Sequence, residues 1–317
     1  MKLNRNLAYR LLMATITILI SATLLASCEL WEYIKPKHEH SFVGNKCEEC
    51  GYLKDSIGLA YKVNGEGTCR IDGIGTCTDK DVKIPEYIDG YKVTEIKGYA
   101  FATCQNLTSI TIPKTVNKIN YHGLYTWSIL ESLTVEEGNP VYHSAGNCLV
   151  ETASKTLICG CKNSVIPADG SVTTIGHSAF SDCYDMASIV IPSGVTNIGN
   201  VAFSECTDLV SVVIPDSVTE IGTSTFRACM KLESIVIPNS VTRLDDYTFQ
   251  YCKGLKGIVI PDSVTSIGDE VFYDCCSLTS IEFEGTKAQW NAISKGDGWN
   301  LGTGNYTVYC TDGDITK

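Results

Sequence analysis

The sequence is poor in charge and poor in histidine. Charged side chains make up 19% of the 317 residues, and only five histidines occur. Low charge combined with abundant aliphatic and β-branched residues excludes a disordered chain. The net charge of −11 excludes a surface built for nucleic acid or anionic lipid headgroups, because an acidic surface repels phosphate groups.

Motifs that signal catalysis are also missing. The sequence contains no nucleophile elbow, P-loop, dinucleotide fingerprint or zinc-protease motif. His122, His143 and His177 occur in unrelated contexts, and an acidic pair such as Asp245 with Asp246 is typical of a solvated repeat surface. The sequence therefore predicts a protein that is not an enzyme.

Residues 1–27 contain no acidic side chain. Lys2, Arg5 and Arg10 precede an apolar run, which is the pattern of an export signal, with a plain membrane anchor as the alternative. The run ends in Leu25-Ala26-Ser27-Cys28, which resembles a bacterial lipobox. That resemblance implies that Cys28 becomes the mature N-terminus and carries a diacylglyceryl lipid. We therefore expect a lipoprotein of the bacterial cell envelope, exposed at the surface.

A tether over residues 28–37 leads to a short cysteine-containing module over residues 38–52. Its Cys-x-x-Cys-Gly turn resembles a zinc knuckle, because two thiolates at that spacing can bind one ion. The candidate zinc ligands are His38, His40, Cys47 and Cys50. A complete zinc ribbon has two knuckles, and this segment has one. The alternatives are therefore a disulfide between Cys47 and Cys50, or a solvent-exposed remnant of a zinc module that binds no metal. Four protein ligands leave no open coordination position, so a zinc ion here would be structural.

A 23-residue period runs through the second half of the chain. Phenylalanine recurs at this spacing and cysteine follows it three positions later, giving the columns Phe180, Phe203, Phe226, Phe249, Phe272 and Cys183, Cys206, Cys229, Cys252, Cys275. The register continues more loosely upstream from Phe101. Leu124 and Phe180 are 56 residues apart, ten more than two repeats, and the excess around residues 136–165 is predicted as an inserted β-hairpin. Such self-similarity predicts a solenoid, whose units bury their apolar faces only against one another.

Within a unit, "LVSVVIP" matches the strand signature of leucine-rich repeats. Alternation predicts that Val212 and Ile214 point inward while Ser211 and Val213 point outward. Proline is expected to close the strand, because it has no N–H to donate to the ladder. "TSTF" is predicted as one helical or 3-10 turn that inserts Phe226 into the core.

The repeat unit resembles that of the BspA-like leucine-rich repeat proteins of bacterial surfaces, Phe-x-x-Cys-x-x-Leu-x-x-Ile-x-Ile-Pro-x-x-Val-x-x-Ile-Gly. Residues 81–283 follow this pattern, while residues 53–80 and 284–317 resemble the family's N-terminal and C-terminal caps. Asp245 departs from the pattern because it stands in a glycine position. The resemblance implies a leucine-rich repeat solenoid that is mostly β, with short helical or 3-10 turns and β-rich caps.

The recurring cysteine is predicted to be structural. A nucleophilic thiol needs a constant activating neighbour, whereas the residue after this cysteine changes from unit to unit. Stacked parallel strands place equivalent Cβ atoms about 4.8 Å apart, beyond the usual ~3.5–4.5 Å of a disulfide. We therefore expect buried free thiols that contribute to an internal ladder.

The outward strand positions predict a binding face. They form two columns, Ser188, Ser211, Ser234 and Ser280 beside Val190, Val213, Val236, Val259 and Glu282. A dry valine stripe with small neighbours can receive a partner, although valine is also simply a good strand former. The resemblance implies adhesion to host or bacterial surface macromolecules, either protein or glycan. The alternative is a passive envelope scaffold or a carbohydrate-binding accessory protein.

Overall fold

The computed structural model describes residues 42–43, 45–48, 53–65, 67–102, 104, 106–120 and 130–317. The chain divides into two compact units, residues 1–42 with 47–50 and residues 43–46 with 51–317. Short strands β1 (Phe42–Val43) and β2 (Lys46–Cys47) occur where the sequence passes between the units. The fold described below is that of the second unit.

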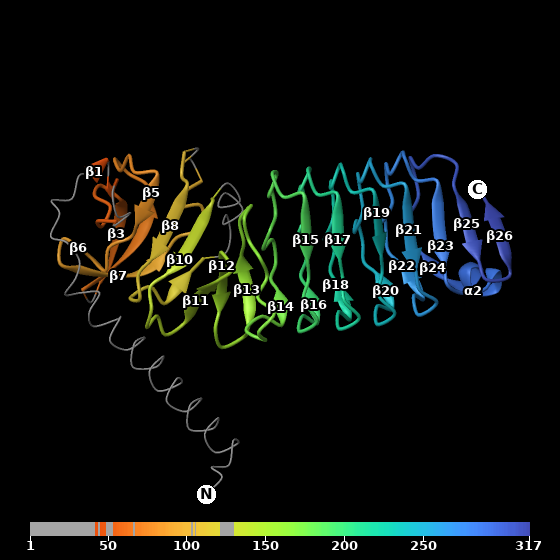
Figure 1. The fold of residues 1–317 in the computed structure, drawn as a ribbon, viewed down its shortest axis with the longest axis horizontal. Helices are drawn as coiled ribbons and strands as arrows, with labels where there is room; N and C mark the ends of the chain where they lie inside the picture. Colours follow the sequence, from red (N-terminus) through yellow and green to blue (C-terminus); the bar gives the residue numbers. More distant parts are fainter. Residues whose placement is uncertain are drawn as a thin grey trace, which may run out of the picture. The chain divides into compact units, whose positions relative to one another are not determined.

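The second unit is a stack of β-coils, each coil being one turn of the chain (Figure 1). Parallel strands from successive coils line up along one side as a first ladder, which consists of three separate hydrogen-bonded sheets. Its strands are β5 (Asp81–Lys83), β8 (Ser109–Ile112), β10 (Ser132–Val135), β15 (Ser188–Val190), β17 (Ser211–Val213), β19 (Ser234–Val236), β21 (Gly257–Ile260), β23 (Ser280–Phe283) and β25 (Thr307–Cys310), and antiparallel β26 (Gly313–Thr316) closes it. Pairing joins residues 23 apart, such as Ile189 with Val212, so one sequence period is one coil.

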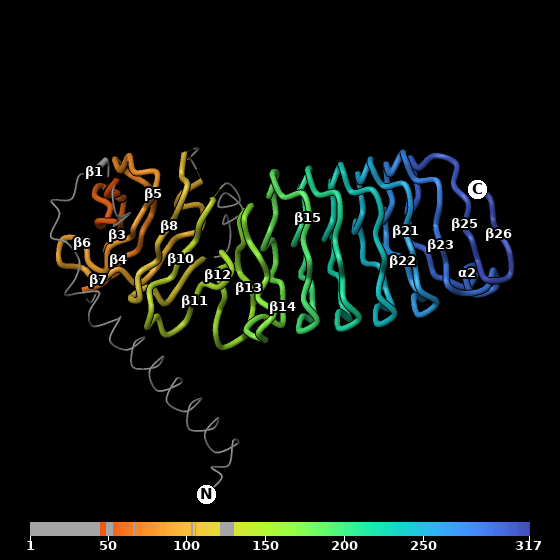
Figure 2. Tube along the Cα trace, in the orientation of Figure 1, coloured from red at the N-terminus to blue at the C-terminus, as the bar shows by residue number. Residues whose placement is uncertain are grey.

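A second ladder runs along another side of each coil. Its strands are β4 (Thr68–Gly73), β7 (Tyr91–Ile96), β9 (Lys118–Ile119), β14 (Thr174–Ile175), β16 (Asn197–Ile198), β18 (Glu220–Ile221), β20 (Arg243–Leu244), β22 (Ser266–Ile267) and β24 (Ser294–Lys295). From β9 onward these strands are two residues long. The path of the chain through the coils is drawn as a tube in Figure 2. The regular strands of this ladder bury the isoleucine or leucine of the repeat, such as Ile221 and Leu244. Both ladders therefore face one interior.

The turn after the first strand explains the proline, serine and valine of the repeat. Proline ends the strand, and its carbonyl accepts a hydrogen bond from the valine three residues later, as from Val218 N to Pro215 O at 3.0 Å. The Ser217 hydroxyl donates to the Val195 carbonyl of the preceding coil at 2.6 Å. The turns therefore stack from coil to coil as the strands do.

The inserted hairpin predicted near residues 136–165 is present. Strands β12 (Cys148–Glu151) and β13 (Thr156–Cys159) pair antiparallel, and β11 (Tyr142–Ala145) pairs with β12. Cys148 and Val150 pack into the core of the C-terminal coils, whereas Leu149 and Ile158 pack into the core of the N-terminal coils. The hairpin is therefore buried on both faces and separates two hydrophobic cores.

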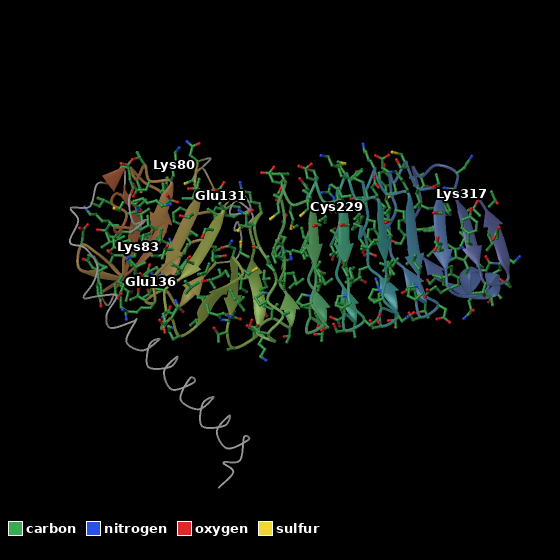
Figure 3. The ribbon with its side chains drawn as sticks, in the orientation of Figure 1. Lys80, Lys83, Glu131, Glu136, Cys229 and Lys317 are labelled. Carbon is green, nitrogen blue, oxygen red and sulfur yellow. The ribbon has the colours of Figure 1, made fainter. Side chains whose placement is uncertain are left out.

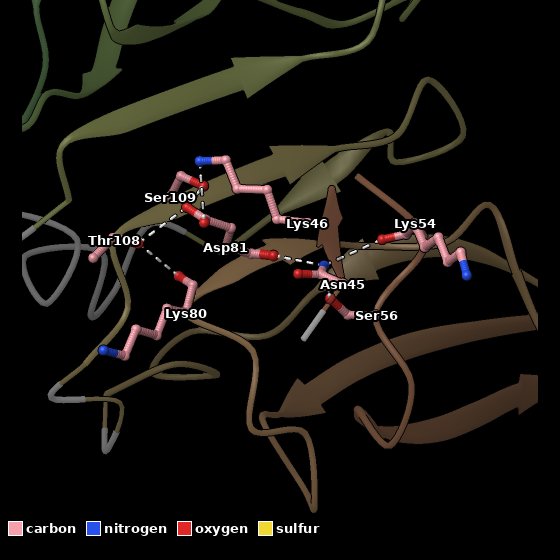
Figure 4. A network of polar contacts seen from close by, with 8 residues as sticks. All are labelled: Asn45, Lys46, Lys54, Ser56, Lys80, Asp81, Thr108 and Ser109. Atoms are coloured by element: carbon pink, nitrogen blue, oxygen red, sulfur yellow. Dashed lines mark hydrogen bonds and ion pairs between the residues drawn. The ribbon is translucent and has the colours of Figure 1, made fainter. Parts of the chain in front are cut away.

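The N-terminal edge of the first ladder is closed by the side chains of Asn45 and Ser56 and by one backbone contact of Ser56 (Figure 4). The Asn45 amide donates to the carbonyls of Asp81 at 2.7 Å and Lys54 at 3.1 Å and to the Ser56 hydroxyl at 3.0 Å. That hydroxyl accepts the Lys83 N–H at 3.1 Å, and the Ser56 N–H donates to Lys83 O at 2.8 Å. These contacts satisfy edge groups of β5 that would otherwise invite pairing with another chain. Strands β3 (Ala60–Gly65) and β6 (Tyr87–Ile88) complete this end.

The C-terminal region adds one more coil before it closes the stack. Helix α2 (Lys287–Ala292) begins at a capping box formed by Thr286 and Gln289. Strands β24 and β25 then continue the register of the coils, pairing Ile267 with Lys295 and Ile281 with Val308. The stack of coils therefore extends beyond residue 283 into the segment that resembles a cap.

Candidate functional site

The interior of the repeats is a stack of phenylalanine rings. Neighbouring rings from Phe180 to Phe272 lie 5.2–5.7 Å apart with interplanar angles of 4–6°. Beside them, each repeating thiol after Cys183 contacts the phenylalanine carbonyl of the preceding coil. Cys206 Sγ lies 3.0 Å from Phe180 O and Cys229 Sγ 3.2 Å from Phe203 O, and Cys229 is labelled in Figure 3. The cysteine column is a hydrogen-bonded ladder of free thiols, as the sequence predicts.

These thiols are unsuited to nucleophilic chemistry. Burial raises the pKa of Cys206 to about 12 and raises the pKa values of Cys183 and Cys229 well above the ordinary range. The thiolate is the reactive form, so the fold keeps the column protonated and inert at neutral pH. The recurring cysteine therefore belongs to the scaffold.

The outer face of the first ladder carries the residues predicted to bind a partner. Val190, Val213 and Val236 are 65%, 56% and 60% exposed, and Ser188, Ser211, Ser234 and Glu282 are exposed beside them. Val259 and Ser280 are only half-buried. Val190 pairs with Val213 on adjacent strands, and Val236 pairs with Val259, which pairs with Glu282. The structure thus brings the predicted residues onto one face, which we call the valine stripe.

Ion pairs lie beside the valine stripe. Lys256 Nζ lies 2.9 Å from a Glu233 carboxylate oxygen, on the residues that precede Gly257 and Ser234 in the strands. Lys231 and Asp208 form a second pair at 2.6 Å. These two pairs neutralise charges that precede the strands, so the exposed valines form an apolar row with a polar border, to which Glu282 adds a charge at one end, as in the core and rim of a protein interface.

The proposed lipidation and metal residues are mostly outside the described residues. Cys28, His38, His40 and Cys50 lie there, and only Cys47 is described, buried in β2. His143 contacts the Thr152 hydroxyl through Nδ1 at 2.9 Å. Across the described ranges, no group of three or more His, Cys, Asp or Glu side chains is arranged to hold a metal ion.

A polar groove on the second ladder is a surface that the sequence pattern did not reveal. It has a volume of about 620 Å³ and is lined by Asn197, Asn200, Glu220, Arg243 and Asp245, among others. Arg243 Nε lies 2.5 Å from an Asp245 carboxylate oxygen, which gives the departure from glycine at position 245 an ion-pair partner. Gly222 and Gly268 occupy the equivalent position in the neighbouring repeats. A Cβ atom there would lie 2.3 Å from Asn200 Oδ1 at position 222 and 2.2 Å from Asp246 Oδ1 at position 268. Asn197, Glu220 and Arg243 occupy the same position of successive repeats, 23 residues apart, but the residue type changes from coil to coil, so a search for recurring residue types did not mark them.

Stacked parallel coils, in which each 23-residue repeat adds one strand to each of the two ladders, define the second unit as a leucine-rich repeat solenoid. The family model described as the BspA type leucine rich repeat region matches residues 76–149 and 173–294 in six copies. The chain therefore belongs to this family.

Two solved bacterial structures with TM-scores above 0.5 share this fold. A leucine-rich repeat protein from Eubacterium ventriosum is 23% identical with a TM-score of 0.56, over 70% of this chain and 65% of that one. The pneumococcal vaccine antigen PcpA is 20% identical with a TM-score of 0.52, over 64% of this chain and 51% of that one. A leucine-rich cell surface protein from Faecalibacterium prausnitzii is 20% identical with a TM-score of 0.46, over 82% of this chain and 98% of that one. No curated protein matches the chain.

Proposed function

We propose that this chain is a non-enzymatic, lipid-anchored surface protein that binds proteins of a host or of neighbouring bacteria through the valine stripe. The observation that carries the proposal is the row of exposed valines on consecutive parallel strands. Soluble proteins rarely leave contiguous apolar rows open to water, and such rows mark interaction sites. The family supports a binding role, since the solenoids of leucine-rich repeat proteins present extended faces to partners.

Binding tests should use the mature chain made with Cys28→Ser, which keeps the protein in solution. We expect binding on an array of extracellular-matrix proteins and glycans, and Val213→Lys or Val236→Lys should abolish it, because a charge replaces apolar contact area. Val165→Lys is the matched control, since Val165 is 71% exposed but lies outside the stripe. Binding that survives both stripe variants, or falls equally with the control, would exclude the stripe as the site.

Membrane attachment through Cys28 rests on the lipobox-like sequence. None of the described helices is long and apolar enough to cross a bilayer. Metabolic labelling with a radioactive fatty acid should mark the natural chain in bacteria and leave Cys28→Ser unlabelled. Labelling of the variant would show that the lipid is elsewhere or that the anchor is of another kind.

We also propose a structural zinc ion bound by His38, His40, Cys47 and Cys50, which, like the lipid on Cys28, rests on a sequence motif. The burial of Cys47 fits a thiolate ligand enclosed by protein, while the other three side chains lie outside the described residues. Metal analysis of the mature chain refolded with zinc should give one ion per molecule, and Cys47→Ser should remove it. Substoichiometric zinc would favour the Cys47–Cys50 disulfide.

A carbohydrate-binding accessory role is the second candidate, and the polar groove favours it. Amide, carboxylate and guanidinium groups from Asn197, Glu220 and Arg243 line it together, and these groups hydrogen-bond sugar hydroxyls. Glycan binding that is lost with Arg243→Ala and kept with Val213→Lys would assign the function to the groove instead of the stripe.

A further inference from the structure

A third ladder joins the coils, built from the turns that carry the phenylalanine rings. At each of five junctions, three backbone N–H groups donate to carbonyls of the next coil. At one junction Val201, Phe203 and Glu205 donate to Thr223, Thr225 and Arg227 at 2.9, 2.9 and 2.7 Å. The flanking donors have positive φ, 61° at both Val201 and Glu205. The segment "TSTF" is predicted from the sequence to form one helical or 3-10 turn. It does have the i to i−3 hydrogen bonds of such a turn, but right-handed and left-handed residues alternate along it, so it is not a continuous 3-10 helix.

All hydrogen bonds between coils in this ladder point the same way. The Ala202 carbonyl accepts from Phe180 N, and the N–H of the same peptide unit, on Phe203, donates to Thr225 O. A planar trans peptide holds its C=O and N–H in opposite directions, so each unit passes the hydrogen bond forward. Parallel β-strands instead alternate donors and acceptors along an edge. The turn ladder is thus three chains of aligned peptide dipoles whose positive ends face the C-terminal end of the stack.

The last coil leaves this positive end open. The carbonyls of Asp297, Trp299 and Leu301 accept from Glu270, Phe272 and Asp274 at 3.0, 2.7 and 2.9 Å. The N–H groups of the same peptide units belong to Gly298, Asn300 and Gly302 and must point away from the stack. No described residue accepts a hydrogen bond from these three N–H groups. Gly298 and Gly302 are exposed and have φ of 60° and 80°, so they keep the left-handed geometry of the ladder without a side chain.

A lysine ammonium lies beside this open row. Lys317, labelled in Figure 3, places its ammonium 3.2 Å from the Asn300 carbonyl and 2.8 Å from the Thr303 hydroxyl. Of the neighbouring acids, Asp274 is paired with Lys253 at 3.3 Å, Glu270 beside Gly298 accepts a hydrogen bond from the Gln250 amide at 2.6 Å, and Asp297 lies at the Gly298 end of the row. Aligned N–H donors at the positive end of a dipole, with a cation beside them, bind carboxylates and phosphates elsewhere in proteins.

The row also carries an exposed apolar side chain. Leu301 lies between the donors of Asn300 and Gly302 in sequence and is 61% exposed. An ordinary β-strand is a poor partner here, because its edge presents N–H groups as well as carbonyls and the open row holds only donors. A segment with several acidic side chains fits better, since carboxylates only accept hydrogen bonds, and an apolar side chain on the same face of the segment can contact Leu301.

We propose that the open amide row of Gly298, Asn300 and Gly302, with Lys317 and Leu301, is a docking site for an extended acidic peptide segment of a partner protein. The site is separate from the valine stripe, so either can exist without the other. It recognises side-chain carboxylates through backbone donors, and it therefore needs no particular side chain at positions 298, 300 or 302.

The test follows backbone amide signals by NMR as a short alternating glutamate–leucine peptide is added to the Cys28→Ser chain. We expect saturable shifts at Gly298, Asn300 and Gly302 that weaken with salt. Gly90 and Gly138, exposed glycines with φ of 86° and 85° on other turns, serve as control amides. Lys317→Glu should weaken binding severalfold, whereas Lys231→Glu, at an ion pair remote in sequence, should not.

Parallel titrations with oligogalacturonate and with inorganic phosphate decide what the row recognises. Weaker or absent shifts with both support an acidic peptide. Equal or stronger binding of oligogalacturonate would overturn the assignment in favour of an acidic glycan, and equal binding of phosphate would reduce the site to a simple anion site. Absence of shifts, or equal shifts at Gly90 and Gly138, would remove the site altogether without touching the valine stripe.

Discussion

The coils on the two sides of the inserted hairpin are held together in different ways. On the C-terminal side one hydrophobic cluster runs from Cys148 to Val308, with the stacked phenylalanine rings inside it. On the N-terminal side a second cluster is closed by individual polar contacts, those of Asn45 above all. Where the columns repeat, each coil supplies its neighbour with matching apolar surface. Where they break, particular side chains must satisfy the exposed backbone.

The largest expected effect is the loss of stability when a buried phenylalanine is removed, which should differ between the two sides of the hairpin. Phe226→Ala should lower the free energy of unfolding by about 3–5 kcal/mol, because it empties a fully buried site between two stacked rings. Phe101→Ala, in the N-terminal cluster, should cost less, since Phe101 lies outside that stack. Urea unfolding of both variants measures the difference, and an equal or larger loss for Phe101→Ala would contradict the comparison.

A smaller effect is expected at the N-terminal edge. Asn45→Ala should destabilise that edge by about 1–3 kcal/mol, because the part-buried carbonyls of Lys54 and Asp81 lose the amide donor of the buried Asn45. Asn45→Asp should lower the stability of the edge by a similar amount, because aspartate is similar in size but has no N–H to donate. Lys46→Ala removes an exposed ion pair with Asp81 and should change the stability little. Amide exchange at Lys83 reports the local opening, and unchanged exchange in Asn45→Asp would show that packing, not hydrogen bonding, closes the edge.

The thiol ladder should make the C-terminal side sensitive to alkali. Burial raises the folded pKa of Cys206 above its unfolded value, so the unfolded state loses its proton first as pH rises. Stability is then complete below about pH 9 and falls above it, by up to about 1.4 kcal/mol per pH unit for each such thiol. Cys206→Ala should flatten this dependence in denaturant titrations between pH 8 and 11. If the free energy of unfolding of Cys206→Ala fell with pH as steeply as that of the unsubstituted protein, ionisable groups other than Cys206 would be responsible for the pH dependence.

The smallest expected effect is at the valine stripe. Val213→Lys should change the free energy of unfolding by less than about 0.5 kcal/mol, because the side chain is already 56% exposed. Val212→Lys, one residue away but buried, is the matched contrast and should be severely destabilising. Thermal unfolding of the pair checks this, and a large loss for Val213→Lys would mean that the stripe is part of the core.

The columns were predictable because a residue that recurs at a fixed spacing must meet the same surroundings in every coil. The core could therefore be predicted from recurring residues such as Phe203, Cys206 and Ile221. The hairpin could be predicted from the extra residues around "ETASK", which interrupt the period. Contacts between unique residues left no such trace, as where Asn45 donates to Asp81 across 36 positions. The groove residues Asn197, Glu220 and Arg243 do fall 23 residues apart, but a position whose residue type changes in each coil gives no recurring signal. The left-handed turns were hidden because Val201 and Tyr247 adopt positive φ without being glycine. Glycines four residues apart, Gly298 and Gly302, were the available signal for the open row.

Hydrogen exchange measured amide by amide in the native protein tests the stacking of the coils most directly. We predict that the N–H groups of Phe203, Phe226 and Phe249 exchange only with global unfolding, since each is bonded to the next coil, and that those of Gly298, Asn300 and Gly302 exchange almost as fast as in an unfolded chain. Rapid exchange at Phe226, or strong protection at Gly302, would contradict the account.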